Sequence, residues 1–356
     1  MKDWGFGLIG CGRISAKHLE VLSHLPNAHL AGVCDIVSEK AERVGRERSV
    51  PWWTNFRDLL STSGIDVVSV LTESGNHAWV ALEALSAGKH VVVEKPMALR
   101  LGDADAMVSC AETHGVRVFT VKQNRYNPPV QLLKRAIDEG RFGRIIECTA
   151  RVRWHRGQEY YDQASWRGTW AQDGGVITNQ AIHYVDLLQW LMGGVGSVFS
   201  LSGRYQHEIQ AEDTAVSVLH YKNGAIGTFE ATTCANPADL EGSVSVLGEH
   251  GAVEVAGIAV NQMRTWQFAD QRDYDTVAFD SSYIPDSVYG RGHTALLADI
   301  VSSLETHKPC MVEGSAGRNA LEVVTAMYES IETGAPVTVG GAYEHSRLGM
   351  AAGAER

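Results

Sequence analysis

The 356-residue chain lacks several features that would define its class at once. No apolar run approaches the ~20 residues that a membrane-spanning helix needs. The first residues lead directly into a predicted strand and leave no room for a separate apolar signal segment. The six cysteines are scattered and form no C-x-x-C pair. We therefore expect reduced thiols in a cytoplasmic protein rather than a disulfide framework or a zinc site.

Positive charge is also scarce, and the formal net charge is −11. This balance argues against nucleic acid or an anionic membrane as the main partner. An anionic small substrate then requires a local cluster of arginine or lysine. The 44% hydrophobic and 21% charged content is typical of a globular protein, and the length favours two domains.

A nucleotide-binding pattern stands at the start of the chain. Residues 6–10 form a short apolar strand, the run Gly10-Cys11-Gly12-Arg13-Ile14-Ser15 follows, and a helical pattern begins after it. Glycine at 10 permits a tight turn, and glycine at 12 lets a phosphate approach the backbone N–H groups at the helix start. The third glycine of the usual pattern is replaced by Ser15.

Asp35 ends the second predicted strand, at about the distance from the glycine turn expected for an acid that binds ribose. A carboxylate there accepts hydrogen bonds from both ribose hydroxyls and repels a 2′-phosphate, which favours NAD over NADP. The alternative is that Asp35 only caps the next helix.

The first half alternates strands with helical patterns of 10–15 residues, which indicates βαβ units and a parallel sheet. We predict a doubly wound Rossmann domain over residues 1–124. Its strands are expected at residues 6–10, 29–34, 65–71, 90–94 and 117–121.

The fourth of these strands ends in Glu94-Lys95-Pro96. Ligands of open α/β sheets bind at the carboxyl ends of the strands, so Lys95 would present a primary amine to the ligand. The alternative is an ordinary surface Glu-Lys pair before a turn.

The second half changes to alternating strands with tight turns, which indicates a large, mainly antiparallel open sheet. We predict an α/β substrate and oligomerisation domain over residues 125–356, with a C-terminal helix that packs back on the first domain. Strands are expected at 145–154, 215–220, 225–233, 242–247, 252–255 and 262–268, and helices at 129–139, 179–191, 294–307 and 317–332.

Polar residues cluster between Asp173 and Asp186. Offsets of four and three residues place Asn179, His183 and Asp186 on one face of the predicted helix. An amide, an imidazole and a carboxylate on one face suit proton abstraction from a sugar hydroxyl. Alternatively, Asn179 caps the helix and His183 is satisfied by Asp186. The His183–Asp186 spacing resembles a metal-ligand pair, but no further cluster supports it, so we expect no metal.

Arginines and aromatics gather nearby, where they can grip a pyrophosphate and stack on a uracil. The alternative is a solvated strand face or a subunit contact. These residues are Arg151, Arg153, His155, Arg156, Tyr160, Tyr161, Trp166 and Arg167.

Taken in order, these motifs resemble the glucose–fructose oxidoreductase/inositol dehydrogenase (Gfo/Idh/MocA) family. The resemblance implies that Lys95 meets the hydroxyl being oxidised and that His183 is the acid/base. Many members have aspartate four residues before that histidine, where this chain has Asn179. The implied catalytic residues are Lys95, His183 and Asn179. The implied cofactor-binding residues are Gly10, Gly12, Arg13, Ile14, Asp35, Thr72, Ser74, His77, Glu94, Lys95, Pro96 and Gln123.

Several segments are similar to one branch, the UDP-N-acetylglucosaminuronate 3-dehydrogenases of bacterial surface-polysaccharide synthesis. They are residues 121–125, 158–162, 166–170, 179–181 and 286–290. The resemblance implies oxidation of the sugar C3 hydroxyl with NAD, a homotetramer, and in some members re-oxidation of bound NADH by 2-oxoglutarate. The implied substrate-binding residues are Lys95, Arg156, Tyr160, Tyr161, Trp166, Arg167, Asn179, His183, Tyr289 and His293.

Two other functions stay open. One is an inositol or simple sugar dehydrogenase of the same family, which would need no uridine pocket. The other is a catalytically silent NAD-bound sensor, which would have no use for the pair Lys95 and His183.

Overall fold

The computed structural model describes residues 2–285 and 290–350 and divides the chain into two compact units. The first unit runs to Lys122 and also includes His293–Arg318. The second unit comprises Gln123–Gly292 and the chain from Asn319 onward. The sequence pattern places residues 293–318 in the second domain and predicts only the last helix to pack back on the first.

The first unit is built on a six-stranded sheet in the order β3-β2-β1-β4-β5-β6, and all of its strand pairs are parallel. The central strands are apolar on both faces, because helices cover both sides of such a sheet. The strands are β1 (Trp4–Ile9), β2 (Ala28–Cys34), β3 (Trp52–Trp53), β4 (Val67–Val70), β5 (His90–Val93) and β6 (Val118–Thr120).

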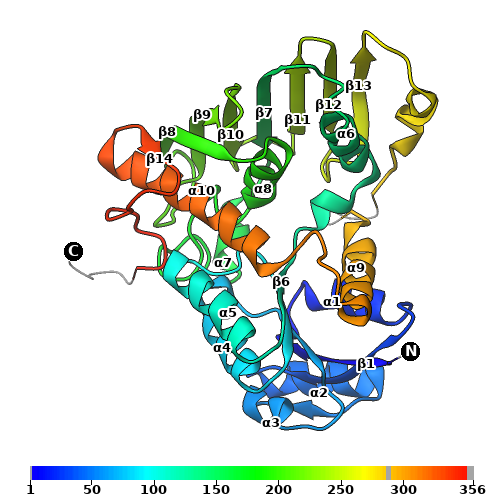
Figure 1. Cartoon of the computed structure of the whole chain (residues 1–356). Coiled ribbons are helices and arrows are strands. Elements are labelled where there is room, and N and C mark those ends of the chain that lie inside the picture. The colour runs from blue at the N-terminus through cyan, green and yellow to red at the C-terminus, as the bar shows by residue number, and fades with distance from the viewer. Residues whose placement is uncertain (1, 286–289, 351–356) are drawn as a thin grey trace. The chain divides into compact units, whose positions relative to one another are not determined.

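In this unit helices alternate with strands along the chain, which the colours of Figure 1 follow from blue to cyan. They are α1 (Ser15–Leu22), α2 (Ser38–Arg48), α3 (Phe56–Leu60), the 3₁₀ turn η1 (Ser74–Asn76), α4 (His77–Ser86) and α5 (Leu101–Thr113). The later segment adds α9 (Gly292–Thr306), of which all but Gly292 belongs to this unit. The predicted Rossmann sheet is confirmed.

The second unit is built on an eight-stranded sheet in the order β13-β12-β11-β7-β10-β9-β8-β14. Only the β7–β10 pair is parallel; the other pairs are antiparallel. The strands are β7 (Ile145–Arg153), β8 (Val195–Gly203), β9 (Thr214–Tyr221), β10 (Ile226–Thr232), β11 (Glu241–Gly248), β12 (Gly251–Ala256), β13 (Gln262–Phe268) and β14 (Val337–Thr338). The predicted mainly antiparallel sheet is confirmed.

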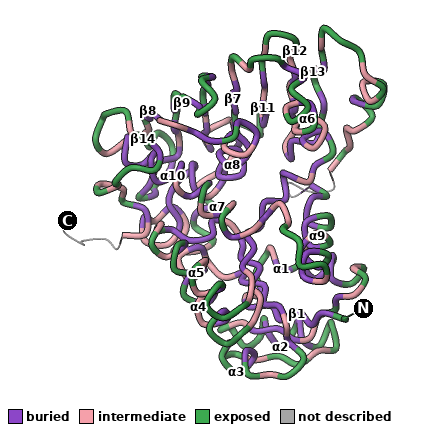
Figure 2. The backbone as a smooth tube through the Cα atoms, in the orientation of Figure 1, coloured by how far each residue is buried: buried purple, intermediate pink, exposed green. Residues whose placement is uncertain are grey.

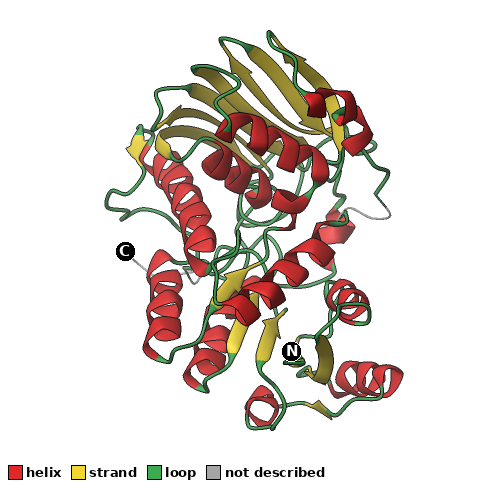
Figure 3. Ribbon diagram, turned by 45° about the vertical axis from the view of Figure 1, so that its right-hand side comes forward, coloured by secondary structure: helices red, strands yellow, loops and turns green. Residues whose placement is uncertain are grey.

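Helices of the second unit lie along one face of its sheet (Figures 1 and 3). They include α6 (Pro128–Asp138), α8 (Ile182–Leu191) and α10 (Gly314–Thr333), and α8 is almost wholly buried (Figure 2). Shorter elements are η2 (Gln123–Tyr126), α7 (Gln158–Asp162), η3 (Asp273–Val277) and η4 (Phe279–Ser281). On β9 buried and exposed residues alternate, which is the pattern of a sheet with one covered and one open face.

Several boundaries differ from the sequence expectation. The helix predicted from residue 179 begins at Ile182, so Asn179 lies in the turn that precedes α8. Strand β8 was not predicted because its sequence, VGSVFSLSG, is rich in serine and glycine, and its pairing with β9 overrides that weak propensity. The two-residue strands β3 and β14 are too short to leave a periodic signal.

The boundary between the two units falls within the last helix, α10. Its residues up to Arg318 belong to the first unit, and the rest belong to the second. Within residues 2–285 and 290–350, no helix combines the length and the apolar content required to cross a bilayer.

Candidate functional site

The glycine turn after β1 has the geometry of a phosphate-binding turn. Gly10 has a φ of +105°, and a Cβ atom there would lie 2.6 Å from the carbonyl oxygen of Leu71, so a side chain is excluded. Gly12 is exposed, and a Cβ placed on it would meet no atom within 4 Å. This open space lies directly before α1, where backbone N–H groups favour an anion. Arg13 is exposed beside it, and Ile14 immediately precedes α1.

Asp35 lies at the end of β2 and links to this turn. One carboxylate oxygen accepts the N–H of Cys11 at 2.8 Å, and the other accepts the N–H of Val37 at 2.8 Å. The aspartate therefore fixes the glycine turn and also caps the start of the next segment. These bonds are compatible with ribose binding, because each carboxylate oxygen can accept more than one hydrogen bond.

His77 ties together the two loops that follow β4 and β5. Its Nδ1 lies 2.7 Å from the carbonyl oxygen of Pro96, and its Nε2 lies 3.0 Å from the carbonyl oxygen of Thr72. Burial lowers the pKa of His77. Ser74 is buried in the same loop, one residue after the half-buried Glu73.

Lys95 follows β5 directly, at the carboxyl end of the parallel sheet, and is half-buried. Its neighbour Glu94 is buried and contacts His18 of α1 and His293 at the start of α9. His293 was expected to bind substrate, and the structure places its ring beside Glu94 within the first unit.

In the second unit, α8 presents His183 next to Gln123. The Nε2 atom of His183 lies 3.1 Å from the side-chain nitrogen of Gln123, and both residues are buried. Asp186, one turn further along α8, accepts two hydrogen bonds of 2.8 Å from the guanidinium of Arg125. This buried fork anchors η2, which carries Gln123, to the helix that carries His183.

Asn179 is held by a carboxylate that the sequence spacing did not assign to it. Its amide nitrogen donates a hydrogen bond to buried Asp173, which also accepts the N–H of Gly168 at 2.8 Å. The amide oxygen of Asn179 accepts from the hydroxyl of Tyr160 at 3.4 Å and from Gln180 at 3.1 Å. The aspartate that many family members have at position 179 is absent, but Asp173 supplies a carboxylate beside it.

Tyr160 also lies between two arginines. The guanidinium carbon of Arg167 is 4.2 Å from the centre of the Tyr160 ring, and that of Arg156 is 5.7 Å away. The centre of the Trp166 ring is 5.6 Å from the guanidinium carbon of Arg167. The structure therefore brings together four of the predicted substrate-binding residues.

Other members of the basic cluster have other partners. Tyr161 is buried, and its hydroxyl lies 2.9 Å from that of Thr233. Arg153 pairs with Glu230 and Glu241 across the sheet, and Arg151 also pairs with Glu241. Both arginines are thus neutralised by glutamates of neighbouring strands. His155 bonds the backbone of Ala235.

A cavity of about 730 Å³ opens beside this cluster in the second unit. Tyr161 and Arg167 line it, together with Arg204 and His207. Asp162 and Glu208 line it as well, so its two arginines are accompanied by two carboxylates.

Two groups of three side chains bring possible metal-ligand atoms within 4.8 Å of one another in the described ranges: His18, Glu94 and His293; and His207, Asp213 and Cys234. The ring nitrogens of His207 lie 3.1 Å from Asp213 and 2.7 Å from the carbonyl oxygen of Arg156, so hydrogen bonds already occupy both.

Sequence reasoning assigned no role to His18, nor to Arg125 and Gln180, although the last two lie in segments that resemble one branch of the family. Each acts through a partner far away in the chain or in a turn, and no local spacing signals such a pairing. Tyr289, predicted to bind substrate, lies outside the described residues.

The parallel sheet and the glycine turn are those of a dinucleotide-binding α/β protein. The family profile for the NAD-binding Rossmann fold of the oxidoreductase family GFO_IDH_MocA matches residues 4–122, and the profile for its C-terminal alpha/beta domain matches residues 134–339. The chain belongs to the Gfo/Idh/MocA family of NAD-dependent oxidoreductases.

Two solved structures are similar over nearly the whole chain. The WlbA dehydrogenase of Bordetella pertussis, in complex with NADH and UDP-GlcNAcA, is 41% identical with a TM-score of 0.90, covering 95% of this chain and 98% of that one. The WlbA dehydrogenase of Chromobacterium violaceum, with the same two ligands, is 39% identical with a TM-score of 0.89, covering 95% and 96%. A more distant relative, myo-inositol 2-dehydrogenase of Thermotoga maritima, is 25% identical and covers 92% of this chain and 96% of its own.

Proposed function

We propose that this protein oxidises the C3 hydroxyl of UDP-N-acetylglucosaminuronate (UDP-GlcNAcA) with NAD, giving a 3-keto sugar nucleotide for surface-polysaccharide synthesis. The observation that carries the proposal is the 41% identity over 95% of the chain to a dehydrogenase that holds NADH and UDP-GlcNAcA. At 25% identity, the myo-inositol dehydrogenase offers weaker support for the alternative substrate.

The residues of the first unit fit NAD. The open space at Gly12 admits the pyrophosphate to the start of α1, and Asp35 offers its carboxylate to the ribose hydroxyls. When bound, NAD accepts the hydride from the sugar carbon. The other predicted cofactor contacts stay predictions: Arg13, Ile14, Thr72, Ser74, His77, Glu94, Lys95, Pro96 and Gln123.

We assign the chemistry of the hydroxyl to two side chains. Lys95 orients the hydroxyl with its amine, and His183 takes the proton as general base. The positive charge of an oxidised nicotinamide near Lys95 would disfavour its ammonium form and lower its pKa. Donors already in place for the developing alkoxide lower the barrier, because the protein needs no reorganisation as charge builds up.

The second unit supplies groups suited to the sugar nucleotide. Arg156 and Arg167 lie beside Tyr160, so cationic donors and an aromatic face stand in one place, and Arg156 also pairs with Asp239 at 3.2 Å. We assign the pyrophosphate and uracil to this cluster. Asn179, held by Asp173 and adjacent to Tyr160, is assigned to the sugar.

The test is a turnover assay with NAD and UDP-GlcNAcA that follows NADH absorbance and identifies the oxidised carbon by NMR. We expect the product to be oxidised at C3. UDP-N-acetylglucosamine should react far less efficiently, because it leaves a cationic partner of the carboxylate unpaired, which costs on the order of 1–3 kcal/mol. Equal efficiency on both sugars, or preference for myo-inositol, would reject the proposed substrate. Equal or tighter binding of NADP would reject the role of Asp35.

We also propose that the protein is a cytoplasmic homotetramer. All six cysteines are free thiols, which suits a reducing compartment. The open face of the second sheet carries Leu201, Val216, Val218 and Ile226, all exposed. Leu201 pairs with Val216 across β8 and β9, and such a contiguous apolar patch favours burial against a second copy of the chain. The role of 2-oxoglutarate as re-oxidant rests on the family resemblance.

A further inference from the structure

We propose that His18, Glu94 and His293 form a buried triad whose carboxylate positions Lys95 for catalysis. The inference rests on the proposed function, because it concerns the lysine assigned to the reacting hydroxyl. The triad uses residues of the first unit only.

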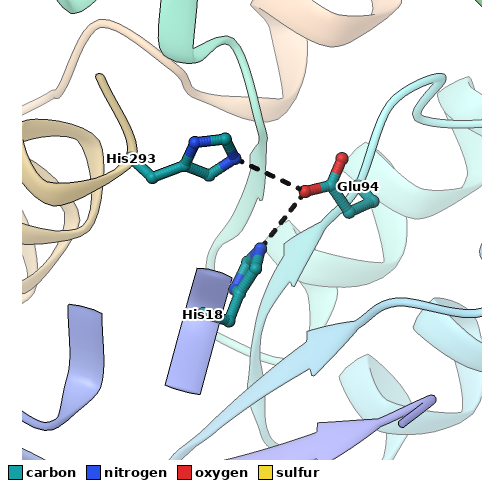
Figure 4. A group of neighbouring side chains, drawn as sticks. All are labelled: His18, Glu94 and His293. Atoms are coloured by element: carbon teal, nitrogen blue, oxygen red, sulfur yellow. Dashed lines mark hydrogen bonds and ion pairs between the residues drawn. The ribbon is translucent and has the colours of Figure 1, made fainter. Parts of the chain in front are cut away.

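The three side chains converge from separate parts of the chain, as Figure 4 shows. The Nε2 atom of His18 lies 3.2 Å from Oε1 of Glu94, and Nε2 of His293 lies 3.8 Å from the same oxygen. The two imidazole rings are edge to face, with their centres 5.9 Å apart. Relative exposures are 0% for His18, 6% for Glu94 and 1% for His293. The cluster is therefore shielded from bulk water.

The second carboxylate oxygen of Glu94 contacts the backbone of Lys95. Oε2 accepts the N–H of Lys95 at 3.1 Å, while the backbone N–H of Glu94 donates to Val70 in the neighbouring strand at 3.0 Å. One carboxylate oxygen thus hydrogen-bonds to His18 and lies near His293, and the other accepts the lysine amide. Because the backbone of Glu94 is fixed by the sheet, its side chain sets where the Lys95 peptide plane points.

The charge state suits this role. Burial pushes the pKa of Glu94 upward, but its contacts with His18 and His293 hold that pKa well below its usual range. Burial lowers the pKa of His293, which keeps its ring neutral. An ionised carboxylate accepts stronger hydrogen bonds than a neutral one, so it holds the Lys95 amide more firmly.

A divalent metal would use the same three side chains, and the structure favours hydrogen bonds instead. Metal-binding histidines donate their second ring N–H to an acceptor. The Nδ1 atom of His18 is buried and has no hydrogen-bond partner among residues 2–285 and 290–350. With a metal on Nε2, this nitrogen would be an unpaired buried N–H donor. With Nε2–H donating to Glu94, it is only an unpaired acceptor, which is easier to accommodate.

The first test compares Glu94→Ala with Glu94→Gln. Alanine removes both contacts, whereas glutamine keeps a carbonyl oxygen for the Lys95 amide. We expect alanine to lower kcat about 100-fold, as for an Ångström-scale misplacement of a reacting group. The kcat of Glu94→Gln should be at least tenfold higher than that of Glu94→Ala. The matched control is Asp66→Ala, because Asp66 also accepts a backbone N–H, that of Gly5 at 3.0 Å, at the opposite end of the sheet. The control should keep kcat within threefold.

The second test needs no substrate, so it separates this inference from the proposed function. Competitive acetylation followed by mass spectrometry compares the reactivity of Lys95 with that of exposed Lys40. We expect the ratio to change at least threefold in Glu94→Ala, to return toward the wild-type value in Glu94→Gln and to stay constant in Asp66→Ala. If wild-type protein does not oxidise UDP-GlcNAcA but this ratio shifts, the proposed function fails and the triad stands.

A third pair of variants covers the case in which Glu94→Ala does not fold. His18→Leu removes the donor to Glu94, and His18→Gln retains an N–H near the same point. We expect the leucine variant to show the kcat loss and the changed Lys95 reactivity, and the glutamine variant to restore both. Unchanged kcat and unchanged reactivity in both alanine and leucine variants would overturn the proposal. One zinc ion per chain in the purified protein, measured by elemental mass spectrometry, would also overturn it.

Discussion

At the scale of single residues, Lys95 and His183 are the groups on which the proposed chemistry depends. We expect Lys95→Ala and His183→Ala each to lower turnover by about 10²–10⁴-fold, the range for a positioned acid/base group. Both variants should still bind NAD, because neither residue lies in the glycine turn assigned to the pyrophosphate or at Asp35, which is assigned to the ribose. If the two residues act on one hydroxyl, the double variant should cost little more than the worse single one. Steady-state rates measured beside a thermal melt check this, and a wild-type rate for the His183 variant would contradict the mechanism.

Glu212 makes the stability of the protein depend on pH near neutrality. It is wholly buried, and burial raises its pKa from 4.5 to about 7. One carboxylate oxygen accepts the N–H of Ile177 at 3.0 Å and the hydroxyl of Tyr328 at 2.9 Å, while the other has no hydrogen-bond partner among the described residues. The folded protein therefore holds a proton that the unfolded chain releases between pH 4.5 and 7.

It follows that the stability of the wild-type protein falls as pH rises through this window. Glu212→Gln should remove this loss, making the variant more stable at pH 8 by about 3 kcal/mol and equal to the wild type at pH 4.5. Denaturant unfolding at both pH values measures the difference. The control is Glu329→Gln, for which the expected change in stability has the opposite sign. Contacts with His345 help hold the pKa of Glu329 low despite burial. That variant should lose stability at pH 8. A pH-independent effect of Glu212→Gln would refute the assignment.

At the scale of elements, the buried pair of Arg125 and Asp186 joins η2 to α8. Both side chains are almost completely buried, and the guanidinium also lies 5.1 Å from the ring of Trp190. Asp186→Asn leaves the arginine charge buried without its partner, which typically costs 3–5 kcal/mol. We expect a loss of about that size in the free energy of unfolding, measured with urea. A loss below about 1 kcal/mol would show that the pair does not anchor the helix.

At the scale of the whole molecule, the open face of the second sheet is the interface through which we propose that the chains associate. Val218 is 55% exposed on β9. Val218→Glu places a charge on a patch that association would bury, so we expect light scattering after gel filtration to report a smaller particle. The melting temperature of Val218→Glu should fall only by the amount that loss of association causes, because the substitution leaves the fold of each chain intact. Val277→Glu, at a residue 49% exposed outside this face, serves as the control and should leave the mass unchanged. An unchanged mass for Val218→Glu would rule out this face as the interface.

The architecture of the parallel half and the identity of the family are readable from the amino-acid sequence alone. Strands such as β5, with its run Val91-Val92-Val93, and the turn from Gly10 to Gly12 are local signals, readable within about ten residues. The larger antiparallel strands were also readable, because one covered face imposes a period of two. Strand β8 was not, because its serines and glycines have weak strand propensity and only pairing with β9 makes it a strand.

The hydrogen-bonded pairs of polar side chains follow from the tertiary structure and not from the sequence. His18 and Glu94 are 76 positions apart in the chain, Arg125 and Asp186 are 61 apart, and Tyr328 and Glu212 are 116 apart. It also showed that Asn179 precedes the helix of His183 and is held by Asp173. Periodicity reports which face of an element is buried but not what lies opposite that face. Such partners are fixed by packing between distant segments, so the charge states and hydrogen bonds of the site follow from the fold.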